Sequence, residues 1–327
     1  MKRLASVPII LLSGFLGAGK TTWLRNLLQQ GAEERVAVLI NEFGEVGIDH
    51  LLVEPIAPDT VLLDSGCICC QIRGELKDAI LMLLSRAQRG EIPRFERIVI
   101  ETTGLADPAQ IQSTLLFDPV LRHQVVLEQV LVVVDAINCM DVHAKQPEWA
   151  PQVAAADTIL ISKTDLLCER KIPDLQERLA AINPFAKQQR SDEFNTLDEL
   201  TREPSKNAGF ACVQVRPREV ANAETLSLTL DREIDWTTFV IWLAALVHCH
   251  GQKLLRVKCL LNTTTLGQVL IDGVGHTLHP PQHPSTSMHS GEPSRLVFIS
   301  RGLDIENLQA SFEAFVSRGN ESWAKRQ

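Results

Sequence analysis

Nine consecutive residues near the N-terminus, Gly14-Phe15-Leu16-Gly17-Ala18-Gly19-Lys20-Thr21-Thr22, constrain the fold of this chain more than any other feature. They match the G-x-x-x-x-G-K-[ST] pattern of a phosphate-binding loop, or P-loop. The preceding residues 7–12 (VPIILL) are typical of a buried parallel strand, and residues 21–30 are typical of a helix. The sequence therefore predicts a strand, a glycine-rich loop and a helix whose N-terminus faces a phosphate group.

Each residue of this loop has an expected role. Lys20 should reach the β- and γ-phosphates of a nucleotide, and the Thr21 hydroxyl should bind Mg²⁺. Backbone N–H groups should surround the phosphates, because glycines let the chain wrap closely around them. The residues expected to line the nucleotide site in this way are Gly14, Gly17, Ala18, Gly19, Lys20, Thr21 and Thr22.

Length and composition exclude several classes of protein. The chain has 327 residues, which exceeds one typical domain, so we expect two. A net charge of −8 without a basic stripe argues against nucleic acid as a partner. The apolar run after Lys2 and Arg3 is short and leads into the P-loop, and no apolar span approaches the ~20 residues that cross a membrane. We expect neither a signal peptide nor a membrane segment.

Strand-like and helical stretches alternate through the first half of the chain. Short, β-branched runs predict parallel strands buried on both faces, at residues 36–40, 97–100, 130–134 and 158–161. Apolar residues recur at helical spacing over residues 71–89 and 172–182. The expected fold class is α/β, a doubly wound, mostly parallel P-loop NTPase sheet that binds ligands at the carboxyl ends of its strands.

The second half of the chain predicts a different unit. We expect a P-loop domain over residues 1–186, an irregular polar connection over residues 187–223, and a smaller α+β domain over residues 224–327. Its expected strands lie at residues 226–230, 254–261, 269–271 and 295–300, and its helices at residues 236–248 and 305–316. Residues 275–294 are rich in Pro, Ser and His, so we expect an exposed loop there.

A possible base-reading element follows the predicted strand at residues 158–161. Ser162-Lys163-Thr164-Asp165 is a variant of the NKxD element that reads guanine. A carboxylate at Asp165 would accept hydrogen bonds from two donors of guanine that adenine does not offer together. The Lys163 stem can cover the base, whereas Ser162 stands where Asn is usual and leaves the bracing of the segment open. A surface turn is the alternative interpretation.

An acidic residue, Glu101, comes directly after the strand predicted at residues 97–100. It precedes Thr102-Thr103-Gly104 and stands in the Walker B position opposite a P-loop. A carboxylate there supports Mg²⁺, so we place Glu101 with Lys20 and Thr21 in the catalytic group. The Gly104 backbone could face the γ-phosphate. The alternative is that Glu101 only caps the next helix.

Three of the eight cysteines lie within four positions, at Cys67, Cys69 and Cys70. Only a turn brings three such thiolates together, and the preceding Ser65-Gly66 supplies one. Three convergent thiolates favour Zn²⁺, Co²⁺ or Cu⁺ as the bound ion. Together with a nucleotide site, this use of cysteine predicts a reducing cytoplasmic location. Buried thiols or a redox-active pair are the alternatives.

Two carboxylates and a set of histidines are further candidate ligands. Glu42 and Glu45 stand where a P-loop GTPase has switch I, and either could contact Mg²⁺ or the transition metal. A solvated turn is the alternative for both. Four histidines lie in the Pro-rich segment, where they could buffer metal weakly or simply be solvated: His276, His279, His283 and His289. His248 and His250 stand at the end of the helix predicted at residues 236–248, where positive charge is favourable, and they could simply end that helix.

Taken together in this order, GFLGAGKTT, NEFGEVGID, CICC, ETTGLADP and SKTD resemble the CobW-like branch of metal-chaperone GTPases. That branch is related to the urease and hydrogenase nickel-insertion GTPases. The resemblance is strong over residues 7–165 and looser over residues 254–258 and 295–301, which look like the CobW C-terminal domain. This chain has Cys259 where that family often has Gly.

The resemblance implies a function and assigns residues to it. It implies GTP hydrolysis coupled to delivery of zinc or cobalt, with Cys67, Cys69 and Cys70 as metal ligands. It also implies Lys20 and Thr21 at the phosphates and Mg²⁺, and Lys163 and Asp165 at guanine.

We therefore expect a cytoplasmic, Mg²⁺-dependent GTPase with slow intrinsic turnover that binds Zn²⁺, or alternatively Co²⁺, and transfers it to a client metalloprotein. The client would dock on the C-terminal domain, and the chain is compatible with a homodimer. The alternatives are a metal storage or sensing protein regulated by GTP, and an ATP-using P-loop enzyme.

Overall fold

The computed structural model describes residues 6–30, 35–40, 61–64, 72–141, 143–194, 196–201, 223–283 and 293–324. The chain divides into two compact units. The first comprises Met1–Gln176 and Ala186–Lys206, and the second comprises Glu177–Phe185 and Asn207–Gln327. The domain limits expected from the sequence, at residues 186/187 and 223/224, stay a prediction. Among the described residues, no helix combines the length and apolar character needed to cross a membrane.

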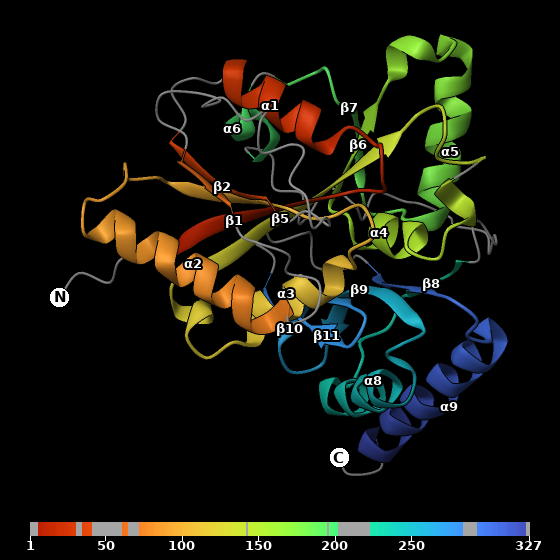
Figure 1. Cartoon of the computed structure of the whole chain (residues 1–327). Helices are drawn as coiled ribbons and strands as arrows, with labels where there is room; N and C mark the ends of the chain where they lie inside the picture. Colours follow the sequence, from red (N-terminus) through yellow and green to blue (C-terminus); the bar gives the residue numbers. More distant parts are fainter. Residues whose placement is uncertain are drawn as a thin grey trace. The chain divides into compact units, whose positions relative to one another are not determined.

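The first unit is built on a seven-stranded sheet with the order β3-β2-β4-β1-β5-β6-β7 (Figure 1). All neighbouring strands in it run parallel. The strands are β1 (Val7–Ser13), β2 (Val36–Ile40), β3 (Val61–Asp64), β4 (Arg97–Glu101), β5 (Val125–Asp135), β6 (Thr158–Ser162) and β7 (Lys187–Arg190). A parallel sheet needs a crossover between consecutive strands, and that crossover is usually a helix that covers the sheet. The expected doubly wound α/β fold is confirmed.

Helices cover both faces of this sheet (Figure 1). They are α1 (Lys20–Gln30), α2 (Ile72–Gln88), α3 (Pro108–Phe117), α4 (Trp149–Ala155), α5 (Ile172–Ile182) and α6 (Leu197–Thr201). Alternate residues of β1 face opposite sides, so Ile10 and Leu12 pack with Trp23 and Leu24 of α1 and with Leu197 of α6 in one buried cluster. Helix α5 contains the boundary between the two units.

The segment expected to be an irregular connection, residues 187–223, instead contains β7 and α6. Strand β7 has the polar sequence KQQR and, among the described strands, pairs only with β6 at the edge of the sheet, so it lacks the apolar pattern of a buried strand. Trp23 Nε1 donates to the Ser191 carbonyl oxygen at 3.0 Å, which ties the end of this strand to α1. For residues 187–190 the expectation of irregular structure is wrong, because pairing with a neighbour, rather than burial, makes this strand. Residues 202–222 of the segment lie outside the described residues.

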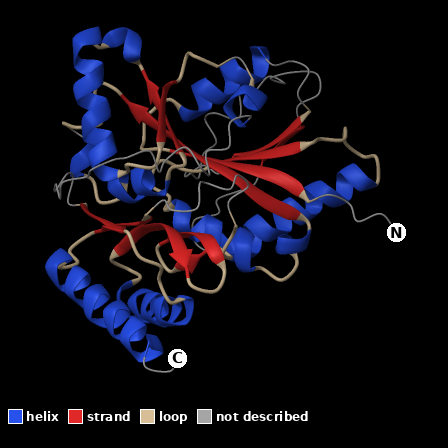
Figure 2. Ribbon diagram, turned by 180° about the vertical axis from the view of Figure 1, so that it is seen from behind, coloured by secondary structure: helices blue, strands red, loops and turns tan. Residues whose placement is uncertain are grey.

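The second unit has a five-stranded sheet with the order β11-β10-β9-β12-β8, in which all neighbouring strands are antiparallel. Its strands are β8 (Glu224–Leu230), β9 (Leu254–Thr263), β10 (Gly267–Val274), β11 (Thr277–Leu278) and β12 (Ser294–Ser300). Two helices, α8 (Trp236–His250) and α9 (Ile305–Ala324), lie together on one side of it (Figure 2). The expected smaller α+β domain is therefore confirmed.

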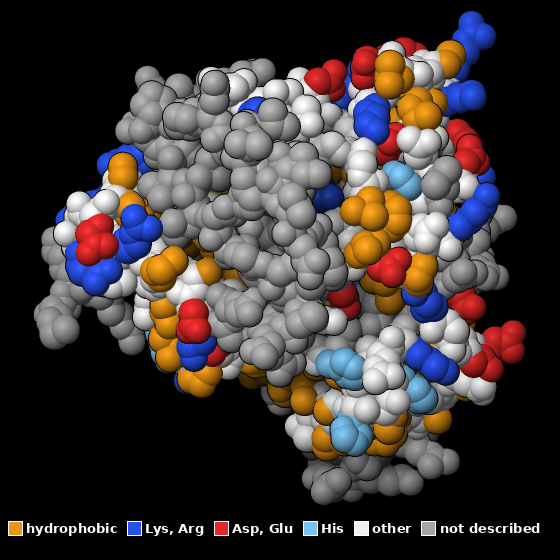
Figure 3. All heavy atoms as spheres, viewed as in Figure 1, with side chains coloured by type: hydrophobic (Ala, Val, Ile, Leu, Met, Phe, Trp, Pro, Cys, Tyr) orange, Lys and Arg blue, Asp and Glu red, His pale blue; other side chains and the backbone are white. Residues whose placement is uncertain are grey.

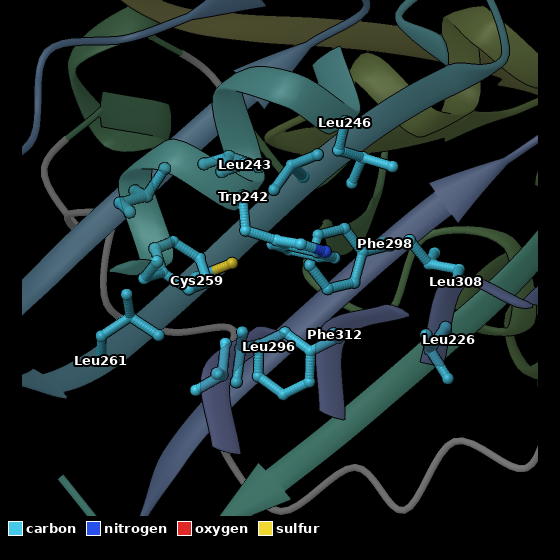
Figure 4. Close-up of a cluster of buried hydrophobic side chains, with 14 of the residues drawn as sticks. Leu226, Trp242, Leu243, Leu246, Cys259, Leu261, Leu296, Phe298, Leu308 and Phe312 are labelled. Carbon is cyan, nitrogen blue, oxygen red and sulfur yellow. The ribbon is translucent and has the colours of Figure 1, made fainter. Parts of the chain in front are cut away.

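Aromatic side chains fill the core between this sheet and its helices (Figure 4). Trp242 of α8 meets Phe298 of β12 and Phe312 of α9 edge to face, with ring centroids 5.6 and 5.1 Å apart. The indole Nε1 donates to Ser311 Oγ at 3.0 Å, so its polar group is satisfied. Cys259, where the family often has Gly, is fully buried in this core.

Part of the segment expected to be an exposed loop, residues 275–294, forms sheet instead. Gly275 has φ +58°, and the turn at Gly275-His276 brings Thr277 back opposite Val274 as β11. Gln282 then bridges to Leu270 through two backbone hydrogen bonds. Residues 284–292 lie outside the described residues.

Candidate functional site

The P-loop connects β1 to α1 and depends on glycine at defined positions. Gly14 has φ +138°, and a Cβ there would lie 2.3 Å from the Val133 carbonyl oxygen, so the backbone leaves no room for a side chain. Gly17 and Gly19 adopt φ +72° and +93°, which other residues rarely adopt. These three glycines turn the chain so that the loop ends at the N-terminus of α1, where backbone N–H groups favour an anion.

Lys20 is buried within the loop that precedes it. Its Nζ donates to the carbonyl oxygens of Gly14 at 2.8 Å and Phe15 at 3.3 Å. These contacts place a cation inside the loop, next to the helix N-terminus. Both features attract phosphate oxygens.

Thr21 and Glu101, which the sequence predicts as Mg²⁺ partners, lie in contact although they are 80 residues apart. Thr21 Oγ1 donates to Glu101 Oε1 at 2.5 Å. Strand β4 neighbours β1 with Glu101 opposite Leu12, which places the carboxylate beside the P-loop. A hydroxyl and a carboxylate are oxygen ligands that Mg²⁺ accepts, so the pair fits this ion.

The alternative interpretation of Glu101 as a helix cap is wrong. Asp107 caps α3, because its side chain accepts a hydrogen bond from the Ala109 N–H at 2.9 Å. The Thr102 hydroxyl donates to Ser13 Oγ at 3.0 Å, which links the ends of β4 and β1. Glu101 therefore belongs to the edge of the sheet that carries the P-loop.

Gly104 lies against the P-loop, as a residue facing the γ-phosphate would. A Cβ on Gly104 would come within 2.5 Å of the Leu16 backbone nitrogen, so only glycine fits. The buried Gln152 of α4 holds this turn, since its Nε2 donates to the carbonyl oxygens of Gly104 at 3.0 Å and Ala106 at 3.1 Å. Sequence reasoning did not single out Gln152, which lies in a helix that it did not predict.

The SKTD segment at the end of β6 contacts the P-loop through two adjacent residues. Ser162 Oγ donates to the Ala18 carbonyl oxygen at 2.7 Å, and Lys163 Nζ donates to the Gly17 carbonyl oxygen at 2.9 Å. Ser162 therefore braces the segment against the loop although it stands in place of Asn. Asp165 is exposed on the short 3-10 helix Thr164–Leu166, accessible to a ligand.

Asp135 belongs to this site although sequence reasoning missed it. It ends β5 and is buried, and its Oδ2 lies 2.7 Å from Lys163 Nζ. Burial by itself raises the pKa of Asp135, but hydrogen bonds from Lys163, from Asn138 and from backbone N–H groups outweigh it and hold the pKa below its usual value. An acidic residue that ends a buried apolar strand, as Glu101 does, was the available signal.

His143 packs behind the P-loop. Its ring contacts that of Phe15, with centroids 4.8 Å apart and ring planes tilted by 45°. Burial lowers the pKa of His143, and nearby Lys163 adds to this while Asp135 opposes it. Burial also raises the pKa of the neighbouring Cys139 thiol to about 12, so this cysteine is a packing residue.

The predicted transition-metal ligands Cys67, Cys69, Cys70, Glu42 and Glu45 lie outside the described residues. Within the described ranges, no three His, Cys, Asp or Glu side chains gather closely enough to hold a metal ion. Histidine side chains do collect over the C-terminal unit, on the lower right of the face in Figure 3. The candidate His289 lies outside the described residues. The other candidate histidines in this unit form no three-ligand site with described residues: His248, His250, His276, His279 and His283.

Comparison with known proteins agrees with this arrangement. The family model described as CobW/HypB/UreG, nucleotide-binding domain matches residues 8–190, and that of the cobalamin synthesis protein cobW C-terminal domain matches residues 223–316. The zinc chaperone YjiA of Escherichia coli is 43% identical over 180 residues, which cover 55% of this chain and 56% of that protein. The zinc-regulated GTPase metalloprotein activator 1 of Schizosaccharomyces pombe is 35% identical over 188 residues, which cover 55% and 44%. The chain thus spans about half the length of the curated relatives it matches.

A solved structure extends the likeness across both units. The crystal structure of Zn(II)-bound YjiA GTPase from E. coli aligns with a TM-score of 0.74 at 30% sequence identity, covering 95% of this chain and 99% of that one. Both family models fall on the two sheets described above. The chain belongs to the CobW/HypB/UreG family, with a nucleotide-binding domain followed by a CobW C-terminal domain.

Proposed function

We propose that this protein is a GTP-hydrolysing zinc chaperone, which binds Zn²⁺ at Cys67, Cys69 and Cys70 and passes it to a client metalloprotein. The observation that carries the proposal is the convergence of the ends of β4 and β6 on the P-loop that follows β1. Lys20, the Thr21–Glu101 pair, Gly104 and Lys163 all contact or adjoin the P-loop. We propose zinc as the metal because two relatives are named a zinc chaperone and a zinc-regulated GTPase.

The phosphates would be held by the P-loop. Lys20 Nζ now donates to two loop carbonyls, and it can exchange these acceptors for phosphate oxygens without leaving the loop. Thr21 Oγ1 and Glu101, which lie in contact, would together hold Mg²⁺. Bound there, Mg²⁺ would neutralise charge that develops on the β- and γ-phosphates.

The base would lie over Lys163, next to Asp165. Lys163 Nζ donates to the Gly17 carbonyl oxygen, so the side chain reaches the P-loop, and Asp165 is exposed two residues further on. The carboxylate would accept hydrogen bonds from the N1–H and amine of guanine. ATP lacks that pair of donors, so nucleotide competition should favour GTP and GDP over ATP.

Hydrolysis would be slow without a partner. We assign neither an arginine finger nor a water-positioning glutamine among the described residues, and Gln152 uses its amide nitrogen to hold Gly104 and Ala106. Phosphoryl transfer then depends on positioning and on charge stabilisation by Lys20 and Mg²⁺. A client docked on the C-terminal domain would receive the metal. We propose that this transfer takes place in the cytoplasm.

The metal site is tested by stoichiometry. Protein purified under reducing conditions should bind one Zn²⁺ per chain, with an affinity that falls at low pH because thiolates must form first. Replacing Cys67, Cys69 and Cys70 together by Ser should abolish this binding. The matched control is Cys168→Ser, since Cys168 is an exposed cysteine outside the motif. Tight binding of one Zn²⁺ per chain by the triple variant would instead assign the metal site to the histidines.

The chaperone mechanism is tested by two reciprocal titrations. Metal is titrated into the protein bound to a GTP analogue or to GDP, and each nucleotide is titrated into apo and metal-loaded protein. We expect the GTP form to hold the metal more tightly, with a coupling free energy of ~1–3 kcal/mol that is equal in both directions. Equal metal affinities in the two nucleotide states would point to storage or sensing instead of delivery.

A further inference from the structure

Lys163 has an unusual backbone conformation. With φ +57° and ψ +31°, it is the only non-glycine residue with positive φ in the part of the chain that the structure describes. This left-handed region costs a residue with a Cβ free energy, and such residues collect at ligand sites where surrounding contacts hold them. The side chain shows what holds it, because Nζ lies between Gly17 O at 2.9 Å and Asp135 Oδ2 at 2.7 Å.

The surroundings of Asp135 admit only a carboxylate. Its Oδ1 accepts from the N–H groups of Ile137 at 2.8 Å and Asn138 at 3.1 Å, and its Oδ2 accepts from Asn138 Nδ2 at 2.9 Å and from Lys163. All four partners are donors. An asparagine in this place would direct its amide hydrogens at one of these donors, so the conservative substitution breaks the arrangement.

The position of Asp135 in the sheet explains why it lies close to both the P-loop and the SKTD segment. Strand β5 lies between β1, which leads to the P-loop, and β6, which leads to the SKTD segment. Asp135 pairs opposite Ser162, and the Ser162 hydroxyl in turn donates to Ala18 of the loop. The carboxylate thus stands between the elements expected to hold the phosphates and the base.

We propose that Asp135 is a positioning residue for guanine: it holds Lys163 against the P-loop so that the Lys163 stem walls the base site and Asp165 faces the base edge. This inference rests on the proposed function. A purely local role would be closure of the turn after β5 through Ile137 and Asn138. The two roles differ in whether Asp135 acts through Lys163.

A double-mutant cycle separates these roles. Asp135→Asn, Lys163→Met and the double variant are titrated with fluorescent GDP and ADP, Met being chosen because it keeps the apolar stem and removes the charge. We expect Asp135→Asn to weaken GDP binding by about tenfold, the value of one charged hydrogen bond, and to weaken ADP binding much less. In the Lys163→Met background the same change should cost less than about twofold. An equal loss in both backgrounds, or an equal loss for both nucleotides, overturns the proposal.

The control is Asp141→Asn, which removes an exposed carboxylate from the same connection and should leave both affinities unchanged. A second measurement needs neither Asp135→Asn nor a nucleotide. The pKa of Asp135, followed by carbon NMR of its carboxylate, should be higher in Lys163→Met than in the native chain, and an unchanged value contradicts the contact. A native chain that binds GDP no better than ADP would refute the proposed guanine specificity. The NMR measurement would then still test whether Asp135 contacts Lys163.

Discussion

The two sheets of this protein use buried charge in different ways. In the N-terminal unit Asp135 ends a parallel strand, and its carboxylate accepts from four donors in the loops that follow β5 and β6. In the C-terminal unit Asp272 lies within β10 and pairs with Arg256 of the neighbouring β9, Nη2 to Oδ2 at 2.9 Å and Nε to Oδ1 at 3.2 Å. The first pair orders loops, whereas the second joins strands that the backbone ladder already pairs.

This difference indicates where function and stability reside. A parallel sheet brings all its strand ends to one edge, so residues distant in sequence meet there in irregular loops that can adapt to a ligand. The antiparallel sheet of the second unit instead gains stability by burying one face, which packs on the aromatic side chains of α8 and α9. We therefore expect changes at the edge of the first sheet to alter nucleotide chemistry, and changes in the second sheet to alter stability.

The largest expected effect tests the stability half of the comparison. Phe298→Ala removes a fully buried ring that Trp242 meets edge to face, so the C-terminal unit should lose ~3–5 kcal/mol of unfolding free energy. Urea denaturation followed by tryptophan fluorescence measures this loss. The control is Phe315→Ala on α9, where the side chain is 45% exposed and the loss should be below ~0.5 kcal/mol. Loss of GDP binding in conditions where Phe298→Ala is still folded would break the comparison.

The next effect tests the nucleotide half. Lys20→Ala should lower the rate of GTP hydrolysis by at least ~100-fold, because it removes the cation from the P-loop, while the melting temperature changes little. Phosphate release and circular dichroism measure the two quantities. Lys145→Ala removes an exposed cation beyond the end of β5 and should leave the rate unchanged. Hydrolysis by Lys20→Ala at the native rate would assign the activity to another site.

A smaller effect sharpens the assignment of the base. Asp165→Asn should weaken GDP binding by ~1.5–3 kcal/mol and improve binding of xanthosine diphosphate, because the amide donates where the carboxylate accepted. Competition titrations with the two diphosphates give both values. The xanthine nucleotide serves as the internal control, since a merely unfolded variant loses both ligands. Unchanged GDP affinity would exclude Asp165 from the base site.

The smallest effect depends on pH and concerns Asp272. Burial raises the pKa of this carboxyl, but Arg256, Lys258 and His279 outweigh it and hold the pKa well below 3.8. Its contribution to stability is therefore fully present above the unfolded pKa and is lost as the pH falls from about 4 towards the folded value, on the order of 1–2 kcal/mol. Urea unfolding at several pH values should show this loss in the native chain and not in Asp272→Asn. Parallel curves for the two proteins would contradict it.

Much of the fold and of the candidate site could be predicted because the signals are local. The P-loop spacing identified Lys20 and Thr21, and the alternation of buried strands and helices identified the doubly wound class. Glu101 was found because an acidic residue ends an apolar strand. Strand β7 and the short β11 were missed because pairing with a neighbour forms them, and their own sequences are polar or very short.

The sequence by itself singled out the residues that we propose bind phosphate, Mg²⁺ and a base, since each proposal depends on side-chain chemistry and on spacing within one segment. Only the tertiary structure decided that Asp135 holds Lys163, that Ser162 braces Ala18, and that Cys259 is a core residue. The first two contacts join residues 28 and 144 positions apart. They exist because the sheet order places β5 between β1 and β6, and strand order is a property of the packed sheet that no local pattern encodes.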